Sequence, residues 1–368
     1  MTKKVTINDI ASLVGVSKAT ISYYLNGNMR KMSLETREKI RLAIEETGYQ
    51  PNKMAQSLVT RDTKTIGVVI ADIINPFISS VIKGIHDTCK KYGYPVNFTN
   101  SDNDQLIEQE NIERLQQQNV SGIILDTVDA NSLLIQKLSK KRTVLVDRQS
   151  REVTLDTVVS NNRNSTKAFL AEMKKAGYED IYFVTFPIEG ISTREMRYQG
   201  FKEEVSADPE KLLVLGQDGT AQKILQLIEQ RQEKIAFFTM NGPALLDFMK
   251  ILNKTDYSYP RDFGLGSYED LEWMEVLNPN VSCIRQDSYK IGQVAAEHLI
   301  KKLRGELAAE PAQLLVAASQ IAELFKLSSA PYFARVDTFF KIFFETACNS
   351  KENSVYYNSR KVKRLTIN

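Results

Sequence analysis

The stretch that decides the amino-terminal fold runs from residue 6 to residue 25 and reads TINDIASLVGVSKATISYYL. Ala11, Gly15 and Ile21 stand at offsets of four and ten within it. They supply a small residue where two helices cross, a glycine for the turn, and a branched apolar residue that anchors the second helix. This arrangement predicts a helix-turn-helix, whose second helix enters the major groove of DNA.

Residues suited to helix capping mark the ends of three predicted helices. Thr6 precedes the first helix, with Asp9 three residues on, and Ser17 precedes the second. A third helix is expected to follow Ser33 and to end at Gly48. The head is therefore predicted to be all-α.

Several motifs of this head resemble the DNA-binding headpiece of the lactose-repressor (LacI/GalR) family of bacterial transcription regulators. They are Thr6–Ala11, Gly15–Ser22, Leu25-Asn26, Thr36–Lys39 and Gly48–Asn52. The resemblance implies that two groups of residues meet DNA, one reading base edges and one contacting phosphate or fixing the helix. The first group is Lys18, Ala19 and Tyr23, and the second is Thr6, Ser17, Thr20, Ser22 and Asn26.

Tyr23 departs from the family, in which arginine commonly stands at the matching position. An arginine fork grips guanine in a way that a phenol does not, so the usual operator rule does not transfer at that base pair. Lys18 is then expected to take a larger share of base readout. Plain helix packing is the alternative role for Tyr23.

Residues 52–60 resemble the hinge helix of the family, which forms on operator DNA. Leu58 matches the leucine that wedges into the minor groove, and a helix of this length is marginal on its own. The other residues of this segment expected to meet DNA are Asn52, Met54 and Ala55.

Charge divides the chain of 368 residues into unlike parts. Residues 1–65 carry 11 Lys and Arg against 6 Asp and Glu, and residues 66–319 carry 29 against 35. A basic head on an acidic body favours a head that meets a polyanion. The 42% apolar composition is typical of a globular protein, and no apolar run is long enough to span a membrane. We expect no secretory signal and a cytoplasmic protein, with Cys89, Cys283 and Cys348 as free thiols.

The body is predicted to be α/β, because short apolar runs alternate with amphipathic helices from residue 65 onward. Two sets of about four strands imply two lobes with a ligand cleft beyond the carboxyl ends of the strands. The resemblance implies a periplasmic-binding-protein-like core whose chain passes between the lobes three times. The expected strands are 66–71, 96–100, 122–126, 143–146, 181–186, 212–215, 235–240 and 263–268, and residues 314–316 could supply a further short strand.

The strand ends carry the candidate effector-binding groups. Their hydroxyl, amide and charged side chains suit a sugar-like molecule. Two departures from the family leave the effector open, since Gly242 replaces an expected aspartate and Glu269 is longer than the usual aspartate. By family pattern the cleft residues are Phe77, Asp102, Asp147, Arg148, Arg197, Asn241, Glu269 and Gln286.

Three guanidinium groups, Arg148, Arg194 and Arg197, are expected near this cleft. Planar forks suit carboxylates and phosphates, so we hypothesise an acidic sugar effector such as 2-keto-3-deoxygluconate. The alternative is that Arg148 and Arg194 are solvated or pair with local acids. Neither reading decides whether the ligand induces or co-represses.

Two other functions compete with that of a regulator. The first is a dehydrogenase, but the G-x-G-x-x-G motif of that class is incomplete, because Gly264 and Gly266 are followed by no third glycine. No other catalytic motif or cofactor site is evident in the sequence. A transport-type sugar-binding protein would account for the body but not for the head. The sequence therefore predicts a DNA-binding repressor of a carbohydrate operon. The repressor is expected to be dimeric, because a short recognition helix needs two half-sites on operator DNA. No enzyme activity, cofactor or membrane contact is expected.

The predicted divisions are a headpiece at 1–48, a hinge and linker at 49–65, a two-lobed effector-binding and dimerisation domain at 66–319, and an extension at 320–368. The extension lies beyond the family pattern and holds 8 Lys and Arg against 4 Asp and Glu. It is interpreted either as a contact for DNA or a partner, or as an unrelated addition without a role. The second reading is favoured, because paired phenylalanines such as Phe339-Phe340 more often signal poor packing than a site.

Overall fold

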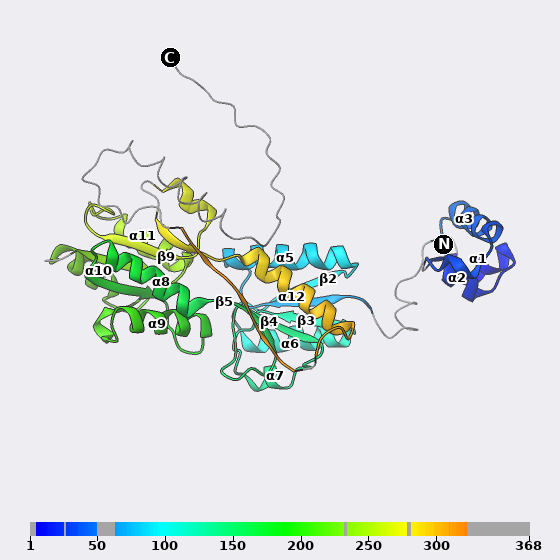
Figure 1. Cartoon of the computed structure of the whole chain (residues 1–368), viewed down its shortest axis with the longest axis horizontal. Coiled ribbons are helices and arrows are strands. Elements are labelled where there is room, and N and C mark those ends of the chain that lie inside the picture. Colours follow the sequence, from blue (N-terminus) through cyan, green and yellow to red (C-terminus); the bar gives the residue numbers. More distant parts are fainter. Residues whose placement is uncertain are drawn as a thin grey trace, which may run out of the picture. The chain divides into compact units, whose positions relative to one another are not determined.

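The computed structural model describes residues 5–25, 27–49, 63–231, 234–277, 281–308 and 310–321. A small helical headpiece precedes a larger α/β core with two sheets (Figure 1). No helix within these ranges is long and apolar enough to cross a membrane.

The headpiece contains three α-helices, α1 (Ile7–Val14), α2 (Lys18–Leu25) and α3 (Leu34–Thr47), with a short 3-10 helix η1 (Met29–Lys31) before the last. Thr6 and Asp9 cap α1 reciprocally, and Gly15 ends it in the left-handed conformation at φ +77°. The predicted turn glycine is thus required by the backbone. A compact apolar cluster holds the helices together, formed by Ile10, Ala11, Ile21, Ile40, Ala43 and Tyr49.

The amino-terminal lobe is built on a six-stranded sheet in the order β11-β5-β4-β3-β1-β2, all pairs parallel. Helices α5 and α12 contact each other along one face, and α6 and α7 belong to the other. The elements are β1 (Ile66–Ile70), α5 (Pro76–Tyr92), β2 (Val96–Asn100), α6 (Gln105–Gln117), β3 (Gly122–Leu125), α7 (Leu133–Gln136), β4 (Thr143–Val146), β5 (Asp156–Ser160), α12 (Ser288–Leu303) and β11 (Gln313–Val316).

Consecutive residues of these strands serve opposite faces of the sheet, as β geometry requires. Val68 and Ile70 of β1 pack under α5 and α12, whereas Val69 packs with Ile112 and Leu115 of α6. Burial on both faces explains why the strands read as continuous apolar runs.

The carboxyl-terminal lobe has a second six-stranded sheet in the order β12-β10-β9-β8-β6-β7, parallel except for the β10–β12 pair. Its aromatic core is divided in the same way: Phe238 packs against Phe169, while its neighbour Phe237 packs against Phe248. The elements are α8 (Asn162–Lys175), β6 (Asp180–Thr185), α9 (Ser192–Glu204), η2 (Pro209–Lys211), β7 (Leu212–Val214), α10 (Thr220–Glu229), β8 (Ile235–Thr239), α11 (Gly242–Leu252), β9 (Gly264–Tyr268), η3 (Glu272–Val276), β10 (Ser282–Arg285) and β12 (Ser319–Ile321).

The chain passes between the lobes three times. The crossings lie between β5 and α8, between β10 and α12, and between β11 and β12. The two-lobed fold class and the triple crossing agree with the expectation from sequence, although each sheet has six strands rather than about four. The strands β5, β10 and β12 were not predicted.

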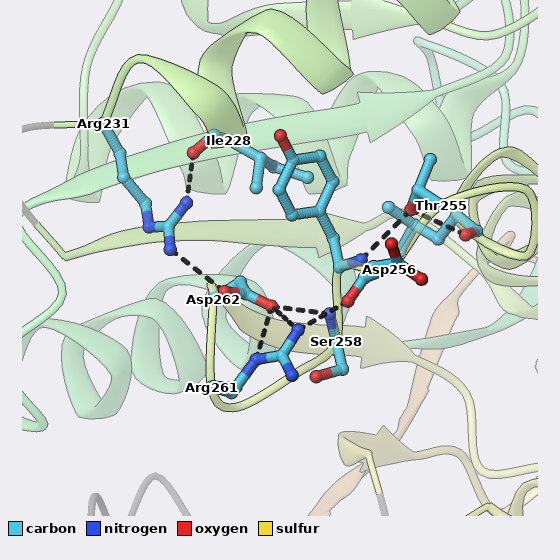
Figure 2. A network of polar contacts seen from close by, with 9 residues as sticks. Ile228, Arg231, Thr255, Asp256, Ser258, Arg261 and Asp262 are labelled. Atoms are coloured by element: carbon cyan, nitrogen blue, oxygen red, sulfur yellow. Dashed lines mark hydrogen bonds and ion pairs between the residues drawn. The ribbon is translucent and has the colours of Figure 1, made fainter.

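A charged network fixes the loop that precedes β9 in the carboxyl-terminal lobe (Figure 2). The carboxylate of Asp262 accepts hydrogen bonds from Arg231, from Arg261 and from the backbone N–H of Ser258. Arg231 also donates to the carbonyl of Ile228 at the end of α10. The network therefore joins α10 to the loop before β9 and serves the fold of this lobe.

Candidate DNA-binding surface and effector cleft

The second helix of the headpiece presents the residues predicted to read DNA. Lys18 and Ala19 are exposed in its first turn, and the hydroxyl of Ser17 accepts a hydrogen bond of 3.1 Å from the N–H of Thr20. Ile21 is fully buried against the other helices. One face of α2 is thus fixed to the headpiece core while the opposite face remains open to solvent.

Tyr23 is 37% exposed, and the Nζ atom of Lys31 lies 4.4 Å from the centre of its ring. Its side chain is therefore not packed in the core, which disfavours the plain packing role. The contact brings the cation of η1 to the surface that carries Lys18 and Ala19. Ser22 is half-buried on the same helix, and Thr6 is engaged in the cap of α1.

Five residues predicted to contact DNA lie outside the described residues. They are Asn26, Asn52, Met54, Ala55 and Leu58. Their roles stay predictions.

A cavity of about 690 Å³ opens between the two lobes. Phe77, Glu269 and Gln286, three of the residues predicted to bind the effector, line it. Trp273 also lines it and was not predicted, although it is the single tryptophan of the chain and follows the Tyr268-Glu269 strand end by a few residues. The remaining lining residues are Pro76, Ser79, Ser80, Asp270, Leu271, Glu272 and Ser288.

A polar chain crosses the floor of this cavity from one lobe to the other. The hydroxyl of Ser160, at the end of β5, donates to Oε1 of Gln286 over 2.7 Å. Nε2 of Gln286 donates to Oε1 of Glu269 over 3.4 Å, and Oε2 of Glu269 accepts from the N–H of Gly242 over 3.1 Å. All four residues are buried, apart from small exposed fractions. Glu269 is thus linked through Gln286 to the opposite lobe.

The pair formed by Gly242 and Glu269 explains the two departures from the family together. A Cβ atom on Gly242 would lie 3.1 Å from Oε2 of Glu269 and 2.2 Å from Cδ1 of Leu271. The longer carboxylate of Glu269 therefore occupies space beside the amino terminus of α11 that a side chain at position 242 would need. Each departure accommodates the other.

Four non-glycine residues that follow strands adopt positive φ angles. Asp102 (+50°) and Asn103 (+59°) follow β2, Asp147 (+64°) follows β4, and Glu269 (+88°) follows β9. Such conformations cost free energy and gather at functional sites. Their concentration at the carboxyl ends of parallel strands supports the location inferred for the cleft.

Arg197 is buried and holds no carboxylate within 4.0 Å among the described residues. Its Nε donates to Oδ1 of Asn162 over 2.8 Å and its Nη1 to the carbonyl of Met240 over 2.8 Å. The guanidinium also lies 3.7 Å from the ring centre of Tyr268. Neutral oxygens and an aromatic face fix this cation and leave its charge largely uncompensated.

Arg194 and Arg148 extend the positive region. Nη1 of Arg194 donates to the carbonyl of Pro187 over 2.6 Å, and no carboxylate of the described residues lies within 4.0 Å of its guanidinium. Burial, followed by repulsion from Arg148 and Arg197, lowers the pKa of Arg194 to about 10. Arg148 donates to the carbonyl of Val128 and lies 3.9 Å from Oδ1 of Asp126. Arg148 thus has a local acid beside it, whereas Arg194 is half-exposed without one, so the alternative of solvation or local pairing stays open for both.

The carboxyl groups beside these arginines have raised pKa values. Burial raises the pKa of Glu269 to about 7, although Arg197 and the N–H of Gly242 act in the opposite direction. Burial likewise raises the pKa of Asp126 to about 7, against the influence of Arg148. Burial also raises the pKa of Asp147, although the residue keeps part of its surface exposed and both Arg197 and Arg148 favour the ionised form. Near neutral pH Asp126 and Glu269 therefore only partly offset the guanidinium charges.

Five of the eight predicted effector residues are not part of the cavity lining, namely Asp102, Asp147, Arg148, Arg197 and Asn241. Asp102 is exposed, and its carboxylate accepts a hydrogen bond from the amide of Asn100. Asn241 precedes α11, where its Oδ1 accepts from the N–H of Ala244 over 2.9 Å and caps the helix. The described part of the chain holds no group of three or more His, Cys, Asp or Glu suited to a metal ion.

Two further buried polar residues were not among the predicted effector-binding residues. Asp126 stood out only as a strand end, and its Oδ1 is buried without a hydrogen-bond partner. Ser160 lies on β5, which the apolar pattern did not reveal, so its link to Gln286 was not foreseeable.

A helix-turn-helix headpiece joined to a two-lobed α/β core with a polar cleft defines a ligand-responsive DNA-binding regulator. Two family models match accordingly: "Bacterial regulatory proteins, lacI family" over residues 6–52 and "Periplasmic binding protein domain" over residues 66–258. The chain belongs to the LacI family of bacterial transcriptional regulators.

Curated relatives match over most of their length. The HTH-type transcriptional regulator KdgR of Bacillus subtilis is 33% identical over 311 residues, which cover 82% of this chain and 92% of the relative. PtxS of Pseudomonas putida, also an HTH-type transcriptional regulator, is 32% identical and covers 83% of this chain and 91% of its own. The ribose operon repressor of Escherichia coli is 26% identical, covering 81% and 93% respectively.

Solved structures share the fold. The lac repressor dimer bound to operator and the anti-inducer ONPF has a TM-score of 0.71 at 20% identity, covering 87% of this chain and 98% of its own. The complex of the regulator CelR with cellobiose has a TM-score of 0.61 at 21% identity, covering 86% and 98%.

Proposed function

We propose that this chain is a cytoplasmic repressor of a carbohydrate-utilisation operon and that an acidic sugar, such as 2-keto-3-deoxygluconate, controls its affinity for operator DNA. It acts as a homodimer, because one short recognition helix per protomer needs a second half-site for useful affinity. No enzymatic step is part of this function. The domain limits proposed above apply to it, with residues 49–65 joining the headpiece to the effector-binding core.

The observation that carries the acidic effector is the pair of guanidinium groups, Arg194 and Arg197, without a carboxylate within 4.0 Å in the described residues. Burying a cation without a counter-charge is costly, so a ligand that supplies a carboxylate is favoured there. The raised pKa values of Asp126 and Glu269 support the same ligand, since their protonated forms do not repel an anion. A bidentate contact between guanidinium and carboxylate is the strongest available recognition.

In this proposal the cleft couples to DNA through the lobes. A ligand that contacts both Glu269 and the arginines either weakens or strengthens the hydrogen bonds that join Glu269 through Gln286 to Ser160. Because these bonds connect the two lobes, the ligand changes the fraction of molecules in which the lobes are closed. The predicted cleft residues Phe77, Asp147, Arg148 and Gln286 complete the binding surface. The sign of the effect on operator affinity follows from which lobe arrangement DNA favours.

A panel of ligands tests the effector class by thermal denaturation of the full chain. We expect gluconate or 2-keto-3-deoxygluconate to raise the melting temperature, since a ligand at 100 times its Kd stabilises by about 2.7 kcal/mol. Ribose and glucose, as neutral sugars, and glucose 6-phosphate form the other arms. Stabilisation by neutral sugars alone would contradict an acidic effector.

A matched pair of variants tests the role of the arginine. Arg194→Gln removes the charge near the cleft, whereas Arg163→Gln removes one from the exposed pair with Glu203 in the same lobe. We expect only the first to weaken sugar-acid binding, by about tenfold or more, as is typical of losing a charge-assisted contact. Equal affinities for the two variants would show that Arg194 does not contact the ligand.

The rival function is a transport-type sugar-binding protein that shares the core but not the DNA role. The headpiece distinguishes the two, because its exposed α2 surface and basic composition have no use in transport. Retardation of a duplex carrying a selected operator, relative to a scrambled duplex, supports the regulator; equal retardation of both duplexes would favour the rival.

A further inference from the structure

A basic patch on the amino-terminal lobe lies outside both sites described above. It consists of Lys137, Lys140, Lys141 and Arg142, which occupy the connection between α7 and β4. All four residues are exposed, and the segment 137–142 contains no acidic residue. The patch therefore concentrates four positive charges within six residues.

Local structure does not account for this charge. Lysines in the last turn of a helix offset the helix dipole, as Lys90 and Lys91 do in α5. Lys140, Lys141 and Arg142, by contrast, lie in a turn that follows the four-residue helix α7 by several positions. In the part of the chain that the structure describes, none of the four patch cations lies within 4.0 Å of a carboxylate. Only Lys137, the C-cap residue of α7, stands at a helix end, and none of the four belongs to an ion pair among the described residues.

The patch shares one edge of the sheet with the segment that joins the core to the headpiece. The N–H of Ser121 donates to the carbonyl of Thr65 over 2.8 Å, and Thr63 donates to the carbonyl of Asn119. Residues 63–65 thus enter the core beside the start of β3.

The starts of β1, β3 and β4 lie side by side at this edge, and the patch directly precedes β4. Ile66 of β1 pairs with Gly122 of β3, and Ile123 pairs with Thr143 of β4, directly after Arg142. Parallel neighbours are about 4.8 Å apart, so the patch begins within roughly 10 Å of the point where the chain enters the core. This edge is therefore where the chain that follows the headpiece enters the lobe.

We propose that the basic patch binds backbone phosphates of duplex DNA flanking the operator. The proposal rests on the DNA-binding role of the family and adds a second contact, made by the core rather than by the headpiece. Contacts from flexible Lys and Arg side chains to phosphate carry no sequence information, but they raise affinity and steepen its salt dependence. Duplex DNA is the favoured partner because the patch is purely cationic and because residues 63–65, which follow the DNA-binding headpiece in the chain, enter the core at this edge.

Fluorescence anisotropy on two duplexes tests the patch. Both carry the same operator, selected from a random library with the wild-type protein, but one extends by ten further base pairs on each side. We expect the extended duplex to bind more tightly and with a steeper salt slope, by about 0.9 per added phosphate contact. The variant K137Q/K140Q/K141Q/R142Q should lose this increment, about tenfold in affinity at 0.1 M salt, and bind the short duplex as wild type does.

The control is the variant K175Q/K234Q/K250Q/K254Q, which removes four exposed lysines from the other lobe and so has the same net charge as the patch variant. We expect it to retain the advantage of the extended duplex. The proposal is overturned if wild type binds both duplexes equally, or if the patch and control variants behave alike, as they would if the patch served a protein or RNA partner. If the wild-type protein selects no duplex from the library, the regulator function itself is wrong. If the wild-type protein binds the short duplex normally but gains nothing from the extension, only the proposal for the patch is wrong.

Discussion

Glu269 combines an unusual backbone conformation, two hydrogen bonds and a raised pKa in one residue of the cleft. Its backbone is held at φ +88°, its carboxylate accepts from Gly242 and Gln286, and burial raises its pKa to about 7. A buried acid that titrates near neutral pH is typical of a functional site rather than of a structural ion pair. The extra methylene relative to aspartate lets its carboxylate reach the amino terminus of α11.

Gly242→Asp tests the complementarity of positions 242 and 269. The new side chain would displace Leu271 and place a second carboxylate beside Glu269, so we expect a loss of about 1–3 kcal/mol in the free energy of unfolding. The loss should shrink below pH 6, where Glu269 is protonated. Gly242→Ala, which requires only movement of Leu271, is the control in urea denaturation; equal stability of wild type and the aspartate variant would refute the packing argument.

Binding of a sugar acid should depend on pH through Glu269. Below its pKa of about 7 the carboxyl is neutral, and above it the ionised form repels an anionic ligand. We therefore expect affinity, measured by calorimetry, to fall about tenfold between pH 6 and pH 8, because a shift of one pKa unit corresponds to a factor of ten. Glu269→Gln should flatten this dependence, whereas a profile unchanged by the substitution would assign the titration to another group.

Sequence reasoning reached the charged groups of the cleft but not their partners. Asp147, Arg197 and Glu269 were predicted from the family pattern, and Asp147 and Glu269 also follow apolar strands. The bonds of Arg197 to Asn162 and Met240, by contrast, join residues 35 and 43 positions apart. Asn241 was also predicted to bind the effector, but its Oδ1 accepts a hydrogen bond from the N–H of Ala244 and caps α11. Contacts of this kind depend on tertiary packing, which a strand-end pattern does not encode.

At the scale of elements, the crossing of α5 and α12 sets the geometry of the amino-terminal lobe. A Cβ atom on Gly84 would lie 2.1 Å from the carbonyl oxygen of Tyr289, and one on Gly292 would lie 2.0 Å from that of Val81. Two glycines therefore allow the backbones of the helices to approach closely. Because α12 begins at the crossing from the other lobe, its seat on α5 also fixes where Gln286 lies.

Gly84→Ala and Gly292→Ala test this crossing. Each added methyl meets backbone atoms, which yield less than a side chain, so we expect each substitution to cost about 1–3 kcal/mol of stability. Lys90→Ala, at an exposed position of α5, serves as the control. Calorimetric melting temperatures give the comparison, and glycine variants that melt with the lysine control would show that the helices can separate freely.

The network around Asp262 makes a pH-dependent contribution to the carboxyl-terminal lobe (Figure 2). The hydrogen bond from Arg261 is the largest influence that lowers the pKa of Asp262 below its usual 3.8, so the ionised form stabilises the fold. Asp262→Asn should cost roughly 1 kcal/mol at pH 7, because Arg261 is largely exposed and solvent screens the pair.

The sign of this pH effect follows from the lowered pKa. The contribution of Asp262 is complete above the unfolded pKa and is lost as pH falls through the folded pKa. The difference in unfolding free energy between wild type and variant should therefore stay constant from pH 8 to pH 5 and narrow below pH 4. A difference that grows on acidification would contradict the assignment.

Elements with a clear apolar pattern were predictable, and those without one were not. β2 and β4 have the predicted limits, whereas β5 begins with Asp156, whose carboxylate is buried against Lys302 and His298. A charge in a strand lowers its apolar signal, and its partners stand more than 140 residues later in α12. Helix α11 begins with Gly242 and Pro243, residues that read as a turn when no sheet is available to place them.

At the scale of the whole molecule, the three crossings explain how one ligand site can act on DNA. Within the described ranges the lobes share few polar contacts, among them Ser160 with Gln286 and the N–H of Gln149 with the hydroxyl of Ser192. A small number of contacts allows two lobe arrangements of similar free energy, so that a ligand shifts their populations. The basic head and acidic body then have separate tasks, one toward DNA and one toward the effector.

The most direct test of the regulator model is the affinity of the full chain for a selected operator duplex, measured by anisotropy at fixed salt with and without a saturating sugar acid. The model predicts that the sugar acid changes this affinity by about tenfold, within the usual range of allosteric coupling, and that ribose or glucose does not. An operator affinity that no sugar acid alters, or that a neutral sugar alone alters, would contradict it.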